Sequence, residues 1–488
     1  MRIIYIDIDT LRADHLGCSG YHRNTSPNID NVASEGINFR NVYASDVPCL
    51  PSRTALITGM FGIRNGVVNH GGRAADLQPE GKDRGFFGRF SMRSWASVFY
   101  LAGWHTASIS SFPFRHGASW WNSGFMESMN LMRGFGGERA DQVVPGALDW
   151  LDRRGKADDW FLHVHLWDPH TPYRTPEDYG NPFESDPVPS WHTEDVRMAN
   201  WDLSGPHSAQ EPWGFRPDEW GEPPPRQPWN ASSMGAVKQI FDGYDVGIRY
   251  ADDAVGVLLN KLTDLGVLED TAVLISSDHG EAFGELGVYA DHQAADEVTC
   301  HIPSILKWPG LKARTFDGLQ YHLDVAATVV DLAGLRVPSH WDGESLAKHL
   351  REGNNDAGRK FLVLSQGAWS CQRSVRWDDY LYMRTWHDGF HGHWNEEMLF
   401  DIANDPHEQE DLFSATNPHA SYGRSVLSDW TSSQLERGYS PVDPMEIVLE
   451  EGGPFHTRGH LPEYIDRLRN TGRSHWADVL ESRHPTEL

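Results

Sequence analysis

The chain has 488 residues, with 42 Lys and Arg against 69 Asp and Glu, which gives a formal net charge of −27. A chain of this length buries a large core, in one large α/β domain or in a large and a smaller domain. Its acidity excludes a nucleic-acid partner, because binding a phosphate backbone needs a basic face. Four widely spaced cysteines without a C-x-x-C pair exclude a disulfide framework and a zinc ribbon.

The chain opens on a β-branched run at residues 3–8 that has neither the basic start nor the cleavage site of a signal peptide. It contains no run of about 18 apolar residues, so we expect no membrane span. These features predict a cytoplasmic protein, or a periplasmic or secreted one if a leader has been trimmed.

Four further buried strands are predicted at 106–110, 160–166, 271–276 and 302–307, and apolar residues recur at helical spacing over 244–262. Strands that alternate with helices predict an α/β fold with a large mixed, mostly parallel sheet sandwiched by helices. Such sheets place their chemistry at the carboxyl ends of the strands.

Two segments differ in texture from this alternating pattern. Residues 175–235 are rich in Pro and Trp without a clean period, which is typical of a lid or a substrate wall. Short antiparallel strand patterns follow residue 358. We therefore predict a main domain over 1–357, which contains the insertion 175–235, and a smaller α+β subdomain over 358–488.

The segment from Cys49 to Arg53 precedes a plausible helix and contains a candidate nucleophile. Pro51 suits a first helical turn, and a nucleophile at a helix N-terminus gains from the dipole and the free N–H groups, which also attract an anionic substrate. An isolated cysteine at this place is more often a packing residue. The neighbouring motifs decide between the two interpretations.

The pattern C-x-P-S-R resembles the signature of the type I sulfatases of the alkaline phosphatase superfamily. In that family the cysteine is oxidised by a maturation enzyme to formylglycine, whose hydrated aldehyde is the nucleophile. Residues 9–17 and 25–30 resemble the family's opening strand and first crossover, and 302–310 its later P-x-I-x-x-W-P-G strand. The resemblance covers residues 3 to about 413 and implies a sulfatase-like fold and a sulfuric ester hydrolase.

A divalent metal site is predicted where two strands end. Asp9 follows the first strand, and Asp278-His279 follows the strand at 271–276, so these side chains are expected to converge. The resemblance implies Asp9, Asp278 and His279 as ligands, completed by the formylglycine formed from Cys49. Oxygen ligands favour Ca²⁺ or Mg²⁺ and a histidine favours Mn²⁺; we expect Ca²⁺ first, on the resemblance. Asp7 is expected behind the ligands.

The resemblance also implies roles in binding and proton transfer. His170 lies in a P-H-x-P-Y segment, and His170 or His292 is expected to protonate the departing alcohol. Arg53 is expected to hold the nucleophilic hydroxyl. Asn69 and His70 are expected to contact the substrate. His163 and His165, which alternate with apolar residues, are expected to be core histidines.

Both lysines that the family places around the anion are absent. Asp291 stands where one is expected, and residues 110–113 read Ser-Ser-Phe-Pro where the other is expected. An anionic transition state needs donors, and Arg53 remains. The other candidate donors are Asn69, His70, His116 and His292.

Three functions remain open from the sequence. The first is hydrolysis of a sulfate ester, on a saccharide or an aryl alcohol. The lost lysines and His279 favour a phosphonate monoester or phosphodiester hydrolase with the same nucleophile, and an unmodified Cys49 would leave an inactive sulfatase-like binding protein. A chain-end saccharide is favoured, because a protein of charge −27 repels a long polyanion. The sequence leaves open whether the chain forms a homo-oligomer.

Sugar-stacking candidates lie in two places. One is the turn at 387–394, which is rich in His. The other is the set of tryptophans in the insertion: Trp191, Trp201, Trp213, Trp220 and Trp229.

Overall fold

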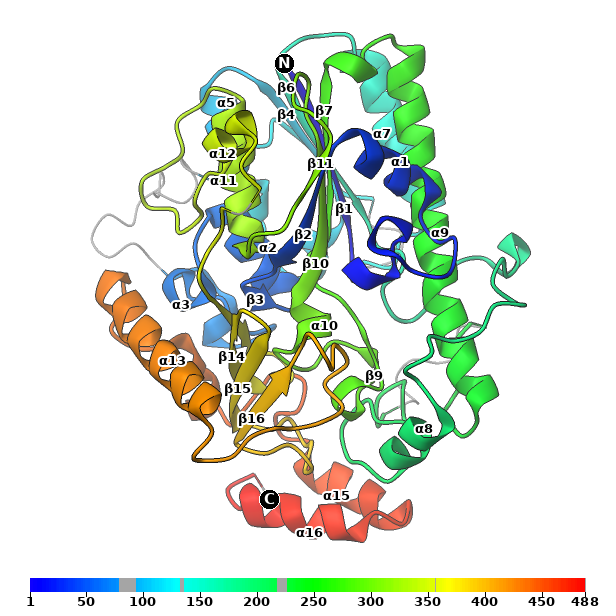
Figure 1. Ribbon diagram of the computed structural model, residues 1–488, viewed down its shortest axis with the longest axis vertical. Coiled ribbons are helices and arrows are strands. Elements are labelled where there is room, and N and C mark those ends of the chain that lie inside the picture. Colours follow the sequence, from blue (N-terminus) through cyan, green and yellow to red (C-terminus); the bar gives the residue numbers. More distant parts are fainter. Residues whose placement is uncertain (79–93, 132–135, 217–225, 356, 488) are drawn as a thin grey trace.

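The computed structural model describes residues 1–78, 94–131, 136–216, 226–355 and 357–487 (Figure 1). Within these residues the main sheet has nine strands in the order β11-β2-β10-β7-β1-β6-β4-β5, with β12 paired to β2. The strands are β1 (Arg2–Ile8), β2 (Ile37–Tyr43), β4 (His105–Ile109), β5 (Glu127–Met129), β6 (Trp160–Leu166), β7 (Thr271–Ser276), β10 (His301–Lys307), β11 (Arg314–Phe316) and β12 (Gln320–Tyr321).

All five strands predicted from the sequence are present, as β1, β4, β6, β7 and β10. β1 pairs in parallel with both β6 and β7, and β4 pairs in parallel with β5 and β6. β10 runs antiparallel to β7 and to β2. The sheet is therefore mixed and mostly parallel, which confirms the predicted fold class.

Helices cover both faces of this sheet (Figure 1). In β1, Ile4, Ile6 and Ile8 pack with α1 (Pro27–Glu35), α7 (Ala140–Arg154) and α9 (Met234–Asp264). Ile3 and Tyr5 pack on the opposite face, with α2 (Cys49–Thr58), α5 (Trp95–Leu101) and α11 (His322–Leu332). Because side chains alternate along a strand, Asp7 and Asp9 continue the face that looks toward α2. The strand thus delivers two carboxylates to the start of α2.

A second, smaller sheet has the order β16-β15-β14-β13-β3 in the described part of the chain. It consists of β13 (Leu362–Gln366), β14 (Cys371–Trp377), β15 (Tyr380–His387), β16 (Glu397–Asp401) and the short β3 (Asp46–Val47). β3 pairs in parallel with β13 and lies two residues before Cys49. The predicted antiparallel C-terminal strands are present, and their sheet is joined to the segment that precedes the candidate nucleophile.

The tail after this sheet is helical. α13 (Pro418–Arg437) packs on the second sheet, and α15 (Leu461–Asn470) packs against α16 (Ser474–Arg483). The remaining elements are η1 (Ala13–His15), η2 (Gly17–Ser19), α3 (Gly62–Asn65), η3 (Arg73–Ala75), α6 (Phe112–Arg115), η5 (Ser119–Asn122), η6 (Glu177–Tyr179), α8 (Glu194–Trp201), η8 (Leu268–Asp270), β8 (Ala282–Phe283), η9 (Glu285–Gly287), β9 (Tyr289–Asp291), α10 (Glu297–Cys300), α12 (Ala347–Glu352) and α14 (Pro444–Glu450).

The insertion at 175–235 is less irregular than its composition suggests. It contains α8, whose first turn is capped by the Thr193 side chain, which accepts a hydrogen bond from the Val196 N–H. Trp220 and the prolines at 223–225 lie outside the described residues. Among the helices that the structure describes, none is long and apolar enough to cross a membrane.

Candidate active site

Cys49 is the first residue of α2 and is buried at the junction of the two sheets. Its Sγ lies 3.1 Å from Nε2 of His279. Burial raises the pKa of the Cys49 thiol well above its usual range, and the neighbouring carboxylates of Asp9 and Asp278 raise it further. The unmodified side chain is therefore a protonated thiol, which is a poor nucleophile.

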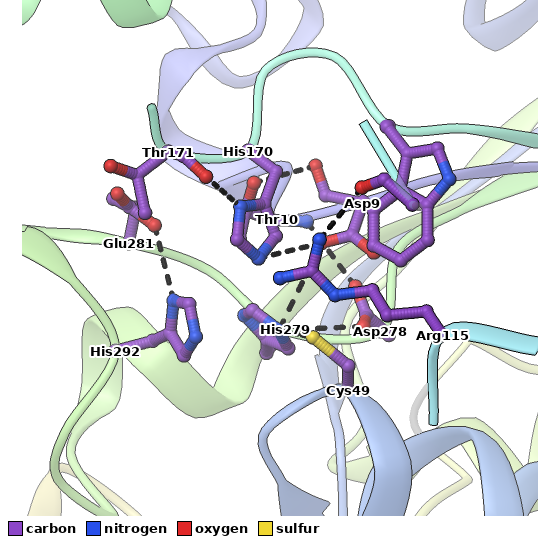
Figure 2. A network of polar contacts seen from close by, with 12 residues as sticks. Asp9, Thr10, Cys49, Arg115, His170, Thr171, Asp278, His279, Glu281 and His292 are labelled. Carbon is purple, nitrogen blue, oxygen red and sulfur yellow. Dashed lines mark hydrogen bonds and ion pairs between the residues drawn. The ribbon is translucent and has the colours of Figure 1, made fainter. Parts of the chain in front are cut away.

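The predicted metal ligands converge on Cys49 (Figure 2). Asp9 follows β1, and Asp278 and His279 follow the adjacent β7. Their ligand atoms and the Cys49 sulfur all lie within 4.8 Å of one another. Oδ1 of Asp9 is buried without a hydrogen-bond partner and lies 4.0 Å from Nε2 of His279. Since ligands of one ion sit at about 2.0–2.6 Å from it, this separation fits a shared divalent cation.

Arg53 lies beneath these ligands, one turn into α2. Its Nε donates to Oδ2 of Asp7 at 2.8 Å, and its Nη1 donates to Oδ2 of Asp9 at 2.8 Å and of Asp278 at 2.5 Å. Burial opposes ionisation of Asp7 and Asp9, but the guanidinium holds the pKa of both below the ordinary value. Arg53 is buried and is not among the cavity-lining residues of the described chain, so its visible role is to fix the carboxylates.

Three neighbours complete this cluster. Asp7 contacts Arg53 and lies behind the ligand atoms. Thr10 turns its hydroxyl back to the Asp9 carbonyl, at 2.7 Å, while its N–H donates to Oδ1 of Asp278. His165 is buried, as expected, but its Nε2 also lies 2.8 Å from Nη2 of Arg53 and 3.2 Å from Oδ2 of Asp9. The sequence interpretation missed this contact, although His165 pairs with Asp7 in the register of β1 and β6.

Two histidines stand above Cys49 in a cavity of about 420 Å³. Nε2 of His170 lies 4.0 Å from Oδ1 of Asp9, and Nδ1 of His292 lies 3.2 Å from Oε2 of Glu281 (Figure 2). Burial lowers the pKa of both imidazoles, that of His292 to about 3, with His279 lowering the latter further. Both are therefore neutral near pH 7 before an anion enters, and each ring then has one N–H to donate.

Of the two residues expected to contact the substrate, His70 lies at the cavity and Asn69 lies behind it. His70 lines the cavity, and its Nδ1 lies 2.9 Å from Nε2 of His456. Asn69 is fully buried, is not among the lining residues of the described chain, and accepts from the His70 N–H at 2.8 Å and from the Phe455 N–H at 3.3 Å. Asn69 thus holds together the two segments that carry His70 and His456.

The cavity wall includes residues that the sequence interpretation missed. Trp369, Phe455 and His456 come from the C-terminal part of the chain, and Arg115 and Arg174 come from the loops after β4 and β6. The candidate donors His70, His116 and His292 line the cavity, and none of its lining residues in the described chain is a lysine. The full lining is Cys49, His70, Arg115, His116, His170, Thr171, Pro172, Arg174, His207, Trp213, Asp291, His292, Trp369, Phe455 and His456.

The predicted sugar-stacking residues are mostly elsewhere. Of the described tryptophans in the insertion, only Trp213 lines the cavity; Trp191 stacks on His407, with ring centroids 4.1 Å apart. The turn at 387–394 contributes no lining residue in the described chain, because His391 and Trp394 stack on each other at 3.7 Å and are buried. That turn is a packing element.

Comparison with known proteins now adds the family. The family model described as Sulfatase matches residues 2–335, and the one described as N-sulphoglucosamine sulphohydrolase, C-terminal, matches residues 284–423. An ulvan-active sulfatase of Formosa agariphila is 23% identical over 441 residues, covering 84% of this chain and 76% of the relative. An N-acetylglucosamine-6-O-sulfatase of Bacteroides thetaiotaomicron is 23% identical over 512 residues, covering 92% and 89%.

Solved structures share the fold. A protein solved in complex with its substrate D-glucosamine-2-N,6-O-disulfate superposes with a TM-score of 0.70 at 20% identity, covering 91% of this chain and 99% of the other. The phosphonate monoester hydrolase of Agrobacterium radiobacter superposes with a TM-score of 0.68 at 18% identity, covering 89% and 96%. At these identities the likeness establishes the fold alone.

Fold and site together define an α/β protein with a cluster of possible metal ligands at the carboxyl edge of a mixed sheet. The chain belongs to the sulfatase family of the alkaline phosphatase superfamily, as its motifs predicted. It is accordingly an enzyme that hydrolyses sulfate esters. The family generally uses a metal and a formylglycine, and the residues present fit both.

Proposed function

We propose that this protein hydrolyses a sulfate ester of a saccharide, with a formylglycine formed from Cys49 by a maturation enzyme and with a divalent metal held by Asp9, Asp278 and His279. The observation that carries the proposal is the convergence of these ligand atoms within 4.8 Å of the Cys49 sulfur. Ca²⁺ is the first choice and Mg²⁺ or Mn²⁺ the alternatives, because two carboxylates accompany one imidazole.

The divalent metal and the formylglycine would supply complementary chemistry. The bound metal would contribute positive charge that favours an ionised hydroxyl, and the hydrated aldehyde would contribute the nucleophile and a second hydroxyl through which sulfate is released. Arg53 helps to hold the pKa of Asp9 below its ordinary value, and it orients Asp9 and Asp278 through hydrogen bonds of 2.8 Å and 2.5 Å. The partnerless Oδ1 of Asp9 remains free to bind the cation.

His170 and His292 are the candidate donors to the departing alcohol. Their ring centroids are 5.5 Å apart, and both line the cavity beside Cys49. Glu281 holds Nδ1 of His292, which aims the other ring nitrogen away from Glu281. Entry of a negatively charged ester favours protonation of either imidazole, so the proton donor is charged only when substrate is present.

A saccharide is the favoured substrate class. The two relatives described above are named as an ulvan-active sulfatase and an N-acetylglucosamine-6-O-sulfatase. Trp213, Trp369 and Phe455 line the wall of the cavity, and flat apolar faces of this kind pack well on sugar rings. A second cavity of about 490 Å³ shares these three residues and extends the binding surface outward.

A phosphonate monoester or phosphodiester hydrolase is the second candidate. It is favoured by the absence of lysine from the cavity lining in the described chain and by the fold shared with a phosphonate monoester hydrolase. Rates of the matured enzyme on an aryl sulfate, an aryl phosphonate and a 6-O-sulfated glucosamine separate the candidates. We expect the highest kcat/KM on the sulfated sugar; a higher value on the phosphonate would replace the first proposal by the second.

The third interpretation drawn from the sequence, a sulfatase-like binding protein without activity, is not proposed, because the chain belongs to a family of sulfate ester hydrolases.

A further inference from the structure

Two arginines of the active-site cavity lie side by side. Arg115 ends α6, in the loop that follows β4, and Arg174 lies in the loop that follows β6. Nη1 of each donates to the same carbonyl oxygen, that of Gly136, at 2.7 Å for Arg115 and 3.4 Å for Arg174. Both line the cavity together with Cys49 and His170.

Within the described part of the chain, neither guanidinium has a carboxylate at contact distance to neutralise it. Among the described residues, no Asp or Glu oxygen lies within 4.0 Å of Arg115 or Arg174, whereas the buried Arg53 contacts three carboxylates. Arg174 is half-buried, and burial lowers its pKa to about 10. The charge of Asp168 opposes this lowering, and the charge of Arg115 adds to it. Two neighbouring cations in a partly buried cavity repel each other and lose hydration, and an anion bound between them offsets both costs.

Arg115 is positioned toward the reacting centre. Its guanidinium lies over the Trp167 ring, 4.9 Å from the ring centroid, and this contact limits the rotamers that the side chain can adopt. Figure 2 shows the side chain extending toward Cys49 and His170. Burial lowers the pKa of His170, and the positive charge of Arg115 contributes to that lowering, as expected for two groups in one cavity.

We propose that Arg115 and Arg174 form an anion-binding pair that holds the non-bridging oxygens of the substrate's sulfate group while its sulfur is attacked by the nucleophile at residue 49. This inference rests on the proposed function and names the cations that the reaction uses. Each guanidinium has several N–H donors in a fixed plane, so the pair matches a tetrahedral oxyanion and stabilises the charge that builds up in the transition state.

The test compares Arg115→Ala, Arg174→Ala and Arg115→Lys with Arg40→Ala, whose arginine is exposed and lies 3.8 Å from Asp317. Two quantities are measured on each matured variant: kcat/KM for an aryl sulfate and the inhibition constant of inorganic sulfate. For Arg115→Ala we expect kcat/KM to fall about 100- to 1,000-fold and sulfate inhibition to weaken at least about 10-fold.

Arg115→Lys should recover part of both losses, because an ammonium retains the charge without the planar fork. Added guanidinium ion should restore part of the activity of Arg115→Ala, and Arg40→Ala should behave as wild type. A purely structural role would lower the melting temperature while leaving the sulfate inhibition constant unchanged, and that result would overturn the pair.

Failure of the pair and failure of the proposed function give different results. If wild type hydrolyses sulfate esters but Arg115→Ala and Arg174→Ala bind sulfate as wild type does, the pair is wrong and the function stands. If wild type hydrolyses no sulfate ester, yet binds inorganic sulfate in calorimetry and loses that binding in Arg115→Ala, the pair stands and the function is wrong.

Discussion

Replacing Arg53 by alanine tests how the cluster of carboxylates is held. Arg53 is 1% exposed and its guanidinium contacts Asp7, Asp9 and Asp278 at 2.5–2.8 Å. Without it, three buried carboxylates share one small volume and lose their only basic side chain other than histidine among the described contacts. Arg53→Ala also removes the packing of this buried side chain, whose guanidinium lies over the Phe112 ring, so Arg53→Lys serves as the variant that keeps the charge.

Breaking a buried ion pair by removing one partner costs about 3–5 kcal/mol of unfolding free energy, because the other charge is left uncompensated. We expect a loss in this range for Arg53→Ala in the presence of a chelator. Arg53→Lys should lose less, since the charge remains but one ammonium cannot replace the fork that reaches Asp7 and Asp9 together. Added divalent cation should reduce the difference in unfolding free energy between Arg53→Ala and wild type, because the cation neutralises the same carboxylates.

Urea unfolding followed by tryptophan fluorescence measures these differences, with Arg40→Ala as the matched control. Exposed ion pairs contribute about 0–1 kcal/mol, so the control should stay within that range of wild type. The reasoning would be refuted if Arg53→Ala were no less stable than Arg40→Ala in the chelator.

Three further predictions concern the metal ligands, a histidine of the C-terminal tail and the cavity wall. Ca²⁺, Mg²⁺ or Mn²⁺ at about 100 times its Kd should stabilise the wild-type fold by about 2.7 kcal/mol and so raise its melting temperature. Asp9→Asn should abolish this rise; a full rise in the variant would contradict the ligand assignment. His484 directly follows α16, and its ring nitrogens lie 2.9 Å from Oδ1 of Asp388 and 3.1 Å from Oε1 of Glu487. Burial opposes the charge of His484, but these two carboxylates raise its pKa to about 9, above the unfolded value of about 6.5. The stabilisation by the charged ring is therefore complete below about pH 6.5 and lost as pH rises through about 9. His484→Gln should therefore cost about 1–2 kcal/mol in urea unfolding at pH 6 and nothing at pH 10, allowing for solvent screening; a cost independent of pH would contradict this. Trp369→Ala should raise KM for a sulfated saccharide about 10-fold and leave KM for a small aryl sulfate unchanged; equal effects on both would remove the stacking role.

Much of the fold was readable because strong local signals coincide with it. The five predicted strands are short apolar runs bounded by turns, and each forms. α9 begins at Met234, ten residues before the predicted start, where the Ser233 side chain caps it by accepting a hydrogen bond from the Ala236 N–H. Gly235 and Gly243 interrupt the apolar pattern, so periodicity did not reveal these first turns. The antiparallel direction of β10 and its place between β2 and β7 depend on long-range pairing, which periodicity does not encode.

The candidate site divides in the same way. The convergence of Asp9, Asp278 and His279 was predicted because these residues follow strands whose carboxyl ends lie together, while their role as ligands came from the family resemblance. His456 was not found, since it reaches the cavity only when the helical tail docks: its contact with His70 joins residues 386 positions apart. The remaining C-terminal lining residues depend on the same docking.

The central claim is that residue 49 of the active enzyme is an aldehyde. Mass spectrometry of the peptide that spans Cys49, taken from a sample whose sulfatase activity has been measured, tests it most directly. We predict the mass of formylglycine in active protein, and the mass of cysteine in inactive protein produced without a maturation enzyme. An unmodified Cys49 in a fully active sample would contradict the account.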